Sequence, residues 1–538
     1  MWDAVEAVNT KGEYAIISGR IADLAWDGDS QRVIAVGDGR ERFGHCFTVD
    51  SGNSVGEVSG HSKVVNAVAI RQQRPLRAAT VSDDSSMCFL HGAPFKFATK
   101  AAGLHKGFVL GAAFSPDGST LVTVGADRRI QLYDGKTGEP TKQVGEGVHT
   151  GSVFAVSWAK DSTRFVTASA DQTVRVWDAG SGECVRTWRI GEEGSVSIEN
   201  QQVGVVWPHG RSDGLIISLG LNGDLNYLTE GSDKPIKVVQ GHNKSVTALG
   251  VASEGNGNII TTGSFDGKVC SWDVSTGVGT VVEGQAHSNQ VTQFAAGSGQ
   301  TFSVGWDDTL RTIQESTSNF LGTPTKLPSQ PKGIATTSNR TIVALNDSIA
   351  VYANDGKLLS QLPTDYTPSA IAAHNTWVAV GAANNTTIQI YTLASSPSSQ
   401  LTPSHTLSTS TAAISALSFS PDGAHLAAGN ASGKIVAYKT GPEKQWAVAT
   451  DRWSAHTARV LSVAWNAAGT HAASGALDTN VHVWSLAKPG GRVKVANAHK
   501  DGVWGVAWVA VAAGENLQVV VSTGGDAAVK VWGVKGLL

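Results

Sequence analysis

Short apolar runs that alternate with small and polar residues fill most of the chain, and helical spacing of apolar residues is nearly absent. A period of two is typical of half-buried β-strands, whereas an amphipathic helix needs a period of 3.6. Tight turns separate the runs, including the Pro-Asp-Gly turns at 114–118 and 419–423. The pattern therefore predicts an all-β protein made of short antiparallel strands.

The runs recur as a unit of about 44 residues, which is the WD-repeat period of ~40–45 residues. The clearest copies contain an Asp and, six residues later, an aromatic residue that closes a third strand, as in 169–178, 264–273, 477–485 and 525–533. Third strands end at residues 2, 49, 90, 133, 177, 228, 272, 313, 352, 391, 438, 484 and 532. Each unit is expected to form one four-stranded blade of a β-propeller.

Propellers commonly close with about four to eight blades, so this many units requires two rings. The boundary is expected near Gly241, which gives an N-terminal WD-repeat propeller in residues 1–241 and a C-terminal seven-unit propeller in residues 242–538. The first propeller would lack its first blade and most of its second, and the last blade would lack its outer strand. Both rings are therefore expected to be unclosed and less stable than in a chain extended upstream.

Two units carry a polar set that can lock a blade, and its members are His149, Ser169, Asp171 and Trp177 in one unit and His242, Ser264, Asp266 and Trp272 in the other. The His is expected to bridge the turn Asp and the strand Ser, whose hydroxyl accepts the indole N–H of the Trp. In the last two units Ala476 and Gly524 occupy the Ser position, so shorter networks are expected there. A catalytic triad would occur once, whereas this set recurs with the repeat, so we interpret it as structural.

Composition and charge narrow the class of function. Charged residues make up 16% of the chain and the formal net charge is −3, without the basic excess typical of nucleic-acid binding. No export signal or membrane span is indicated. The four cysteines have no C-x-x-C spacing, which favours reduced cytoplasmic thiols over a disulfide or zinc framework. We find no cofactor loop, metal set or non-repeating acid–base pair, so an enzyme that uses a propeller channel is the least favoured class.

Several segments resemble the actin-interacting protein 1 family of WD-repeat proteins, namely residues 36–52, 91–97, 151–158, 199–207, 241–243, 271–277 and 304–312. The motifs GRERFGH and PFKF within them are not general features of WD repeats. The resemblance implies two seven-bladed propellers, the first incomplete here, in a monomeric protein of the cytoplasm and cortical actin cytoskeleton. It also implies binding to actin filaments with ADF/cofilin, promotion of filament severing and disassembly, and limited regrowth at barbed ends.

Candidate partner-binding residues gather in neighbouring units of the first propeller, where turns and connecting loops share one face. Arg and aromatic side chains on such a face are typical of protein–protein hot spots. By resemblance, the surface that engages cofilin-decorated actin corresponds to Glu41, Asp83, Phe97 and Phe108, with Arg40 and Arg42 as neighbours. The alternatives are solvated turn charges, a Phe packed against the next blade and, for the whole chain, a general WD-repeat scaffold of another multiprotein complex.

Overall fold

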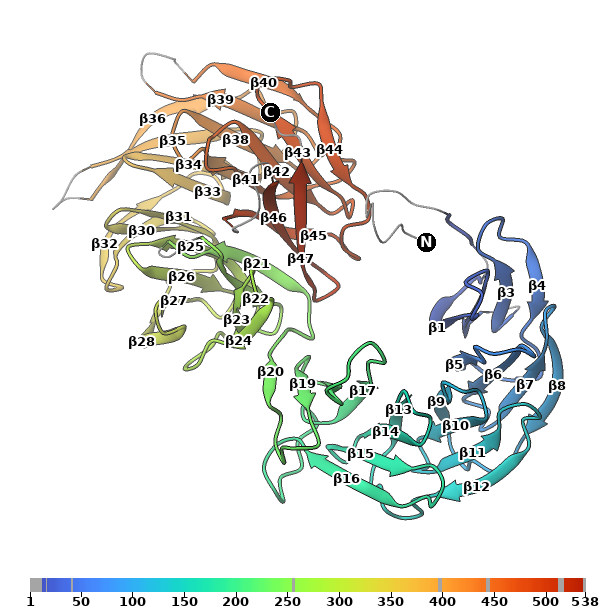
Figure 1. Ribbon diagram of the computed structural model, residues 1–538. Helices are drawn as coiled ribbons and strands as arrows, with labels where there is room; N and C mark the ends of the chain where they lie inside the picture. The colour runs from blue at the N-terminus through green and yellow to red at the C-terminus, as the bar shows by residue number, and fades with distance from the viewer. Residues whose placement is uncertain are drawn as a thin grey trace. The chain divides into compact units, whose positions relative to one another are not determined.

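The computed structural model describes residues 12–15, 17–39, 42–253, 257–394, 399–441, 446–510 and 517–535. These residues form 47 β-strands and contain no helix, and therefore no helix long and apolar enough to cross a membrane. The strands make twelve antiparallel sheets, each of which follows the order of the chain (Figure 1). The all-β class and the WD-repeat propeller architecture predicted from the sequence are confirmed.

The first unit, Met1–Val239, contains five four-stranded sheets. Their strands are β1 (Arg20–Trp26), β2 (Arg32–Asp38), β3 (Gly44–Thr48) and β4 (Ser54–Glu57); β5 (Val65–Ile70), β6 (Arg77–Ser82), β7 (Met87–His91) and β8 (Lys96–Ala101); β9 (Val109–Phe114), β10 (Thr120–Gly125), β11 (Ile130–Asp134) and β12 (Pro140–Val144); β13 (Val153–Trp158), β14 (Arg164–Ser169), β15 (Thr173–Asp178) and β16 (Cys184–Arg189); and β17 (Gln202–Val206), β18 (Ile216–Gly220), β19 (Leu225–Leu228) and β20 (Lys237–Val239).

The second unit, Gln240–Leu538, contains seven sheets, of which the last has three strands in the described residues. Its strands are β21 (Val246–Val251), β22 (Ile259–Ser264), β23 (Val269–Asp273) and β24 (Val278–Val281); β25 (Val291–Gly297), β26 (Gln300–Gly305), β27 (Thr309–Gln314) and β28 (Asn319–Lys326); β29 (Pro331–Thr337), β30 (Arg340–Leu345), β31 (Ser348–Ala353) and β32 (Leu358–Pro363); β33 (Pro368–His374), β34 (Trp377–Ala382), β35 (Ile388–Leu393) and β36 (Leu401–Leu407); β37 (Ile414–Phe419), β38 (His425–Asn430), β39 (Ile435–Lys439) and β40 (Val448–Trp453); β41 (Val460–Trp465), β42 (His471–Ala476), β43 (Val481–Ser485) and β44 (Arg492–Val495); and β45 (Val503–Val509), β46 (Leu517–Gly524) and β47 (Val529–Lys535).

The position of a strand within its sheet sets its sequence pattern. In β14 every residue after the first is buried, because this strand packs against sheets on both faces. In the outer strand β16 exposed and half-buried residues alternate up to a single buried Trp. The hydrophobic core therefore lies between successive sheets, as in the cluster that joins Val122 and Val124 of β10 to Phe165 and Trp177.

The first strand of each sheet packs against the first strand of the next sheet, so the five sheets of the first unit follow one another in an arc (Figure 1). From the sequence, the closing residue of the third strand in the first sheet was assigned two residues too late. Phe47, and not Val49, occupies the aromatic position, because Phe47 pairs with Val33 as Trp177 pairs with Phe165. The longer turn after β2 shifts this position.

The second unit differs from the expectation that both rings are unclosed. Its first strand, β21, packs against β45 and β46 of the last sheet. Ile260 of β22 shares one hydrophobic cluster with Val509, Val519 and Val521 of that sheet. Sheets in a ring are joined through their faces, so among the described residues the first and last sheets meet without a fourth strand on β47. The expectation of an unclosed second ring was therefore wrong.

Candidate functional site

A buried histidine network crosses the sheet formed by β13–β16. His149 Nδ1 lies 2.8 Å from Asp171 Oδ2, and His149 Nε2 lies 2.9 Å from Thr167 Oγ1. The Trp177 indole donates to the same Thr167 oxygen at 2.8 Å. The hydroxyl in this network is thus that of Thr167, so the assignment of Ser169 to this role was wrong.

Strand register explains the difference of two residues. Trp177 sits opposite the second residue of β14, and alternate residues of a strand share a face. Thr167 and Ser169 therefore point to the same side, but Thr167 is nearer to the indole. Ser169 Oγ donates to the Gly151 carbonyl at 3.2 Å and accepts the Asp171 N–H at 3.2 Å. Ser169 thus holds the turn that carries Asp171.

The last two units carry complete networks, contrary to expectation. In each of them a serine hydroxyl lies within 2.8 Å of both a histidine Nε2 and an indole Nε1, in the sets His456, Ser474, Trp484 and His499, Ser522, Trp532. Ala476 and Gly524 lie two residues after these serines. The prediction of shorter networks in these two units was therefore wrong. As in β14, the hydroxyl that meets the indole lies two residues earlier in the strand than the position predicted from the sequence.

Three further histidines make the same contacts and were not identified from the sequence. Each bonds a turn carboxylate through Nδ1 and a hydroxyl through Nε2, in the sets His61, Asp84, Thr80; His105, Asp127, Thr123; and His287, Asp307, Ser303. Their third strands close with Leu, Tyr and Ile in place of Trp. A His placed 20 to 27 residues before the turn Asp is the signal common to the six His–Asp pairs.

The network of β21–β24 departs from this arrangement. His242 Nε2 lies 2.8 Å from Thr262 Oγ1, which also accepts the Trp272 indole N–H at 2.7 Å. Among the described residues, His242 Nδ1 has no hydrogen-bond partner, so the expected bond to Asp266 was wrong. Ser264 donates to Asp266 at 2.5 Å instead. Burial lowers the pKa of His242 to about 4, so this side chain is neutral at pH 7.

Asp171, His149 and Thr167 are hydrogen-bonded in the same order as a nucleophilic triad. They differ from a triad in their burial. Thr167 is fully buried and His149 is 1% exposed, so neither can reach a substrate. Burial alone would raise the pKa of Asp171, but hydrogen bonds from His149 and Thr173 hold it well below its usual range. Because the same set recurs in sheet after sheet, we interpret it as a brace between the loop before the first strand and the turn after the second.

Among the candidate partner-binding residues, Asp83 and Phe108 are brought together by a third side chain. Asn66 Nδ2 donates to Asp83 Oδ1 at 2.7 Å and to the Val109 carbonyl at 2.9 Å. The Phe108 carbonyl accepts the Ala126 N–H at 2.8 Å, while the Phe108 side chain is 49% exposed. Asn66 thus fixes the loop that presents Phe108 beside the turn of Asp83, and nothing in its sequence context identified it.

Phe97 lies on the outer strand β8 and is 45% exposed. Its ring lies against Gly60 in the loop before β5, where a Cβ would come within 2.6 Å of the ring. Lys100 of the same strand donates to the Gly60 carbonyl at 2.7 Å and to Asp84 at 3.1 Å. Phe97 is therefore held against this loop with half of its surface presented to solvent.

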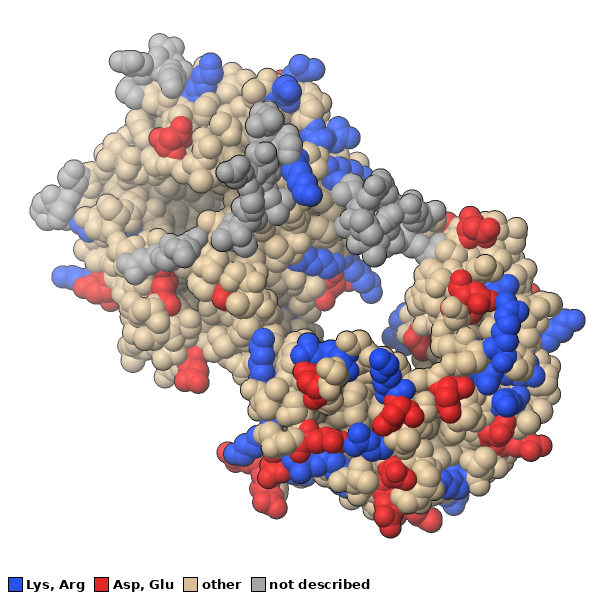
Figure 2. Space-filling model, in the orientation of Figure 1, with Lys and Arg blue, Asp and Glu red and all other residues tan. Residues whose placement is uncertain are grey.

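The charged candidates are less well defined. Arg42 pairs with Glu57 of its own sheet at 3.2 Å, and both side chains are exposed, so this ion pair contributes little stability. Arg40 and Glu41 lie outside the described residues. Acidic and basic side chains are interspersed on the visible face of the first unit (Figure 2).

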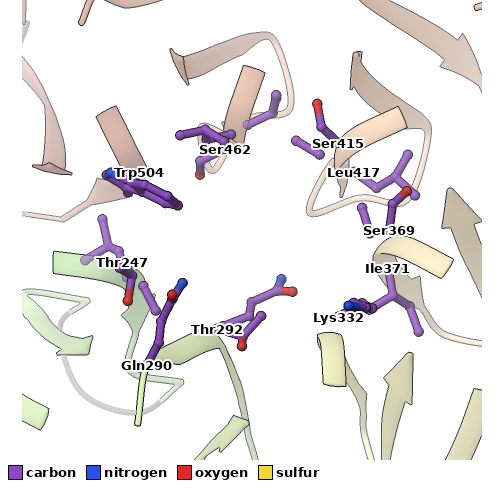
Figure 3. Close-up of a pocket in the computed structure, with 18 of the residues that line it drawn as sticks. Thr247, Gln290, Thr292, Lys332, Ser369, Ile371, Ser415, Leu417, Ser462 and Trp504 are labelled. Atoms are coloured by element: carbon purple, nitrogen blue, oxygen red, sulfur yellow. The ribbon is translucent and has the colours of Figure 1, made fainter. Parts of the chain in front are cut away.

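The centre of the second unit contains a cavity of about 290 Å³ (Figure 3). The first strands of all seven sheets line it, and its polar lining includes Thr247, Thr292, Ser369, Ser415 and Ser462. Lys332 is the one ionisable side chain among the described lining residues, and its Nζ donates to Gln330 at 2.8 Å. This lining contains no carboxylate pair that could act as acid and base.

Comparison with known proteins places the chain in a family. The WD domain, G-beta repeat family matches residues 103–134, 142–178, 233–273, 401–439 and 448–485. An uncharacterized WD repeat-containing protein of Schizosaccharomyces pombe is 44% identical over 99% of this chain and 86% of its own length. Actin-interacting protein 1 of Drosophila melanogaster is 36% identical over 100% of this chain and 85% of its own length. Actin-interacting protein 1 of Caenorhabditis elegans is 34% identical, with 99% and 86% covered. This chain belongs to the actin-interacting protein 1 family of WD-repeat proteins.

Proposed function

We propose that this protein binds actin filaments decorated with ADF/cofilin, promotes their severing and disassembly, and limits regrowth at barbed ends. The observation that carries the proposal is the similarity of nearly the whole chain to relatives named for their interaction with actin. The role of cofilin rests on the family resemblance of the motifs GRERFGH and PFKF.

The surface formed by Asp83, Phe97 and Phe108 supports this proposal. Asn66 holds the Asp83 carboxylate and the backbone next to the half-exposed Phe108, and the half-exposed Phe97 ring lies against Gly60. Side chains that are fixed before binding lose little conformational entropy in a complex. Aromatic residues presented in this way dominate the energy of many protein–protein interfaces. The first unit therefore presents aromatic and acidic side chains that can anchor a protein partner.

Two linked units give a physical basis for the cofilin dependence. Weak contacts made by two connected units reinforce each other, because binding of one raises the effective concentration of the other. A protein that binds the cofilin-altered filament more tightly than the bare filament shifts the filament toward the altered state. Its severing effect is limited by this difference in affinity.

Co-sedimentation with actin filaments tests the proposal. The protein should pellet with cofilin-coated filaments at least tenfold more tightly than with bare filaments. Equal pelleting with both would remove the cofilin-dependent part, and no pelleting with either would favour a scaffold of another complex.

Variants test the binding surface within the same assay. Phe108→Ala and Asp83→Ala should each weaken binding to cofilin-coated filaments by roughly tenfold to a hundredfold, the range of an interface hot spot. The matched control is Val185→Ala, since Val185 is 51% exposed on the outer strand β16 of the same unit. Val185→Ala should bind like the unaltered protein, and equal losses in all three variants would contradict the proposed surface.

We also propose that the protein acts as a monomeric binding protein, without catalysis, on the actin cytoskeleton of the cytoplasm. The match to WD repeats and the similarity to relatives named for their interaction with actin support the non-enzymatic part. Sedimentation equilibrium should give a mass near 55.9 kDa. A fluorescent fusion should co-localise with cortical actin and disperse when filaments are depolymerised.

A further inference from the structure

One repeated histidine network has an additional member, His482, that the repeat does not explain. His456, Asp478 and His482 each direct a donor atom to a common region, and these atoms lie within 4.8 Å of one another. The rings of His456 and His482 are 4.5 Å apart between centroids and stand at 76°. The cluster spans the loop before β41, the turn after β42 and the strand β43.

His482 is the unusual member of this cluster. It is 1% exposed, and neither of its ring nitrogens has a hydrogen-bond partner among the described residues. A buried polar group without a partner is costly, so its persistence calls for a ligand at that position.

Asp478 is also less satisfied than its counterparts in other sheets. A Lys or Arg nitrogen lies within 4 Å of the equivalent carboxylates in four sheets, in the pairs Lys100–Asp84, Arg129–Asp127, Arg311–Asp307 and Lys530–Asp526. Arg311 lies two residues before Ile313 and Lys530 two residues before Trp532, and His482 takes the same position before Trp484. In the described structure, the Asp478 carboxylate accepts hydrogen bonds only from His456 and from the backbone N–H groups of Thr457 and Asn480.

We propose that His456, Asp478 and His482 form a binding site for one divalent transition-metal ion, of which Zn²⁺ is the best match. Two imidazoles and one carboxylate are a common donor set for zinc, whereas Mg²⁺ and Ca²⁺ favour all-oxygen sites. A fourth position is left for water. The ion takes the place of the Lys or Arg that neutralises the carboxylate in related sheets.

The hydrogen bonds around His456 define the proton balance of metal binding. The Asp478 carboxylate accepts the proton on His456 Nδ1 at 2.9 Å, so Nε2 of the neutral ring accepts the Ser474 hydroxyl proton at 2.8 Å. When the ion binds Nδ1, the ring proton moves to Nε2, which donates to Ser474 Oγ, so the imidazole stays neutral and releases no net proton.

The geometry needs only a small adjustment. Bonds of about 2.0–2.2 Å place the donors of a tetrahedral ion roughly 3.4 Å apart, so the donors must close by at most about 1.4 Å. Asp478 lies in the turn beside Thr479, whose φ is +69°. The cations that face His482 are Arg492 and Lys494 of β44, and both are exposed, so water screens their repulsion of the ion.

Titration of the metal-free full chain with Co²⁺, a spectroscopic substitute for Zn²⁺, tests the site. One equivalent should produce visible d–d absorption, and Zn²⁺ should abolish it by competition. His482→Arg restores the cation found in related sheets, so it should fold without metal and lose at least tenfold in Co²⁺ affinity. His405→Gln removes an exposed histidine of β36 and should leave the titration unchanged.

Calorimetry and X-ray absorption give two further readouts on the unaltered protein. Calorimetric Zn²⁺ titrations should show one ion bound for each chain. The X-ray absorption spectrum of the zinc-bound protein should show scattering from imidazole ligands. It should show no shell of sulfur atoms at about 2.3 Å from the zinc ion. Absence of one-equivalent binding, a sulfur shell, or full binding by both His482→Arg and His482→Gln would overturn the proposal.

Discussion

The hydroxyl of Thr167 should stabilise the first unit more than the hydroxyl of Ser169. Thr167→Val keeps the shape of the side chain but leaves His149 Nε2 and the Trp177 indole N–H buried without partners. Each unpaired buried group costs about 1–3 kcal/mol, so the variant, with two such groups, should lose about 2–6 kcal/mol. Ser169→Ala breaks two longer bonds of 3.2 Å at the turn, and its cost should be about 0.5–1.5 kcal/mol.

Hydrogen exchange measured by mass spectrometry on the full chain can resolve this difference locally. Peptides from β14 and β15 in Thr167→Val should exchange roughly 30- to 20,000-fold faster than in the unaltered protein, since every 1.4 kcal/mol is tenfold. Peptides from the second unit serve as an internal control and should not change. A larger effect for Ser169→Ala than for Thr167→Val would refute the assignment of the network.

Three further predictions concern other parts of the chain. His242 has a folded pKa of about 4 against an ordinary 6.5, so the unfolded chain binds more protons below pH 6.5 and stability must fall as the pH drops. Denaturant titrations should show a loss of about 2 kcal/mol from this group between pH 7 and pH 5, and His242→Gln should remove that share of the slope. Gly524→Ser should destabilise the last sheet by about 1–3 kcal/mol in thermal unfolding, because a Cβ at Gly524 would lie 2.3 Å from the Cβ of His499; unchanged melting would contradict this clash. Asn66→Ala should weaken binding to cofilin-coated filaments with an unchanged circular dichroism spectrum, and full binding would show that the link between Asp83 and Phe108 is not needed.

The repeat period made the fold predictable from the sequence. Turn residues and the spacing of Asp and aromatic residues mark each unit, so the class, the two units and most third strands could be read directly. The division of the chain falls at Val239 and Gln240, two residues from the expected boundary. The error at Val49 arose because the longer turn after β2 moves Phe47 out of the common spacing.

Side-chain partners were less predictable, since a strand places alternate residues on the same face. Thr167 and Ser169 both satisfy the pattern, and only the pairing of β14 with β15 decides which hydroxyl meets the indole. Closure of the second ring depends on contacts between β21 and β45, which are about 250 residues apart and leave no local signal. His482 was not identified as a candidate metal ligand from the sequence. Its proposed role depends on its closeness to Asp478 in the preceding turn and to His456 in another loop, which only the structure shows.

Imaging of single actin filaments tests the central functional claim most directly. Filaments partly coated with cofilin should be severed several times more often when this protein is added, and new barbed ends should regrow more slowly. The protein alone should leave bare filaments intact. An unchanged severing rate on cofilin-coated filaments, with the protein shown to be folded, would contradict the account.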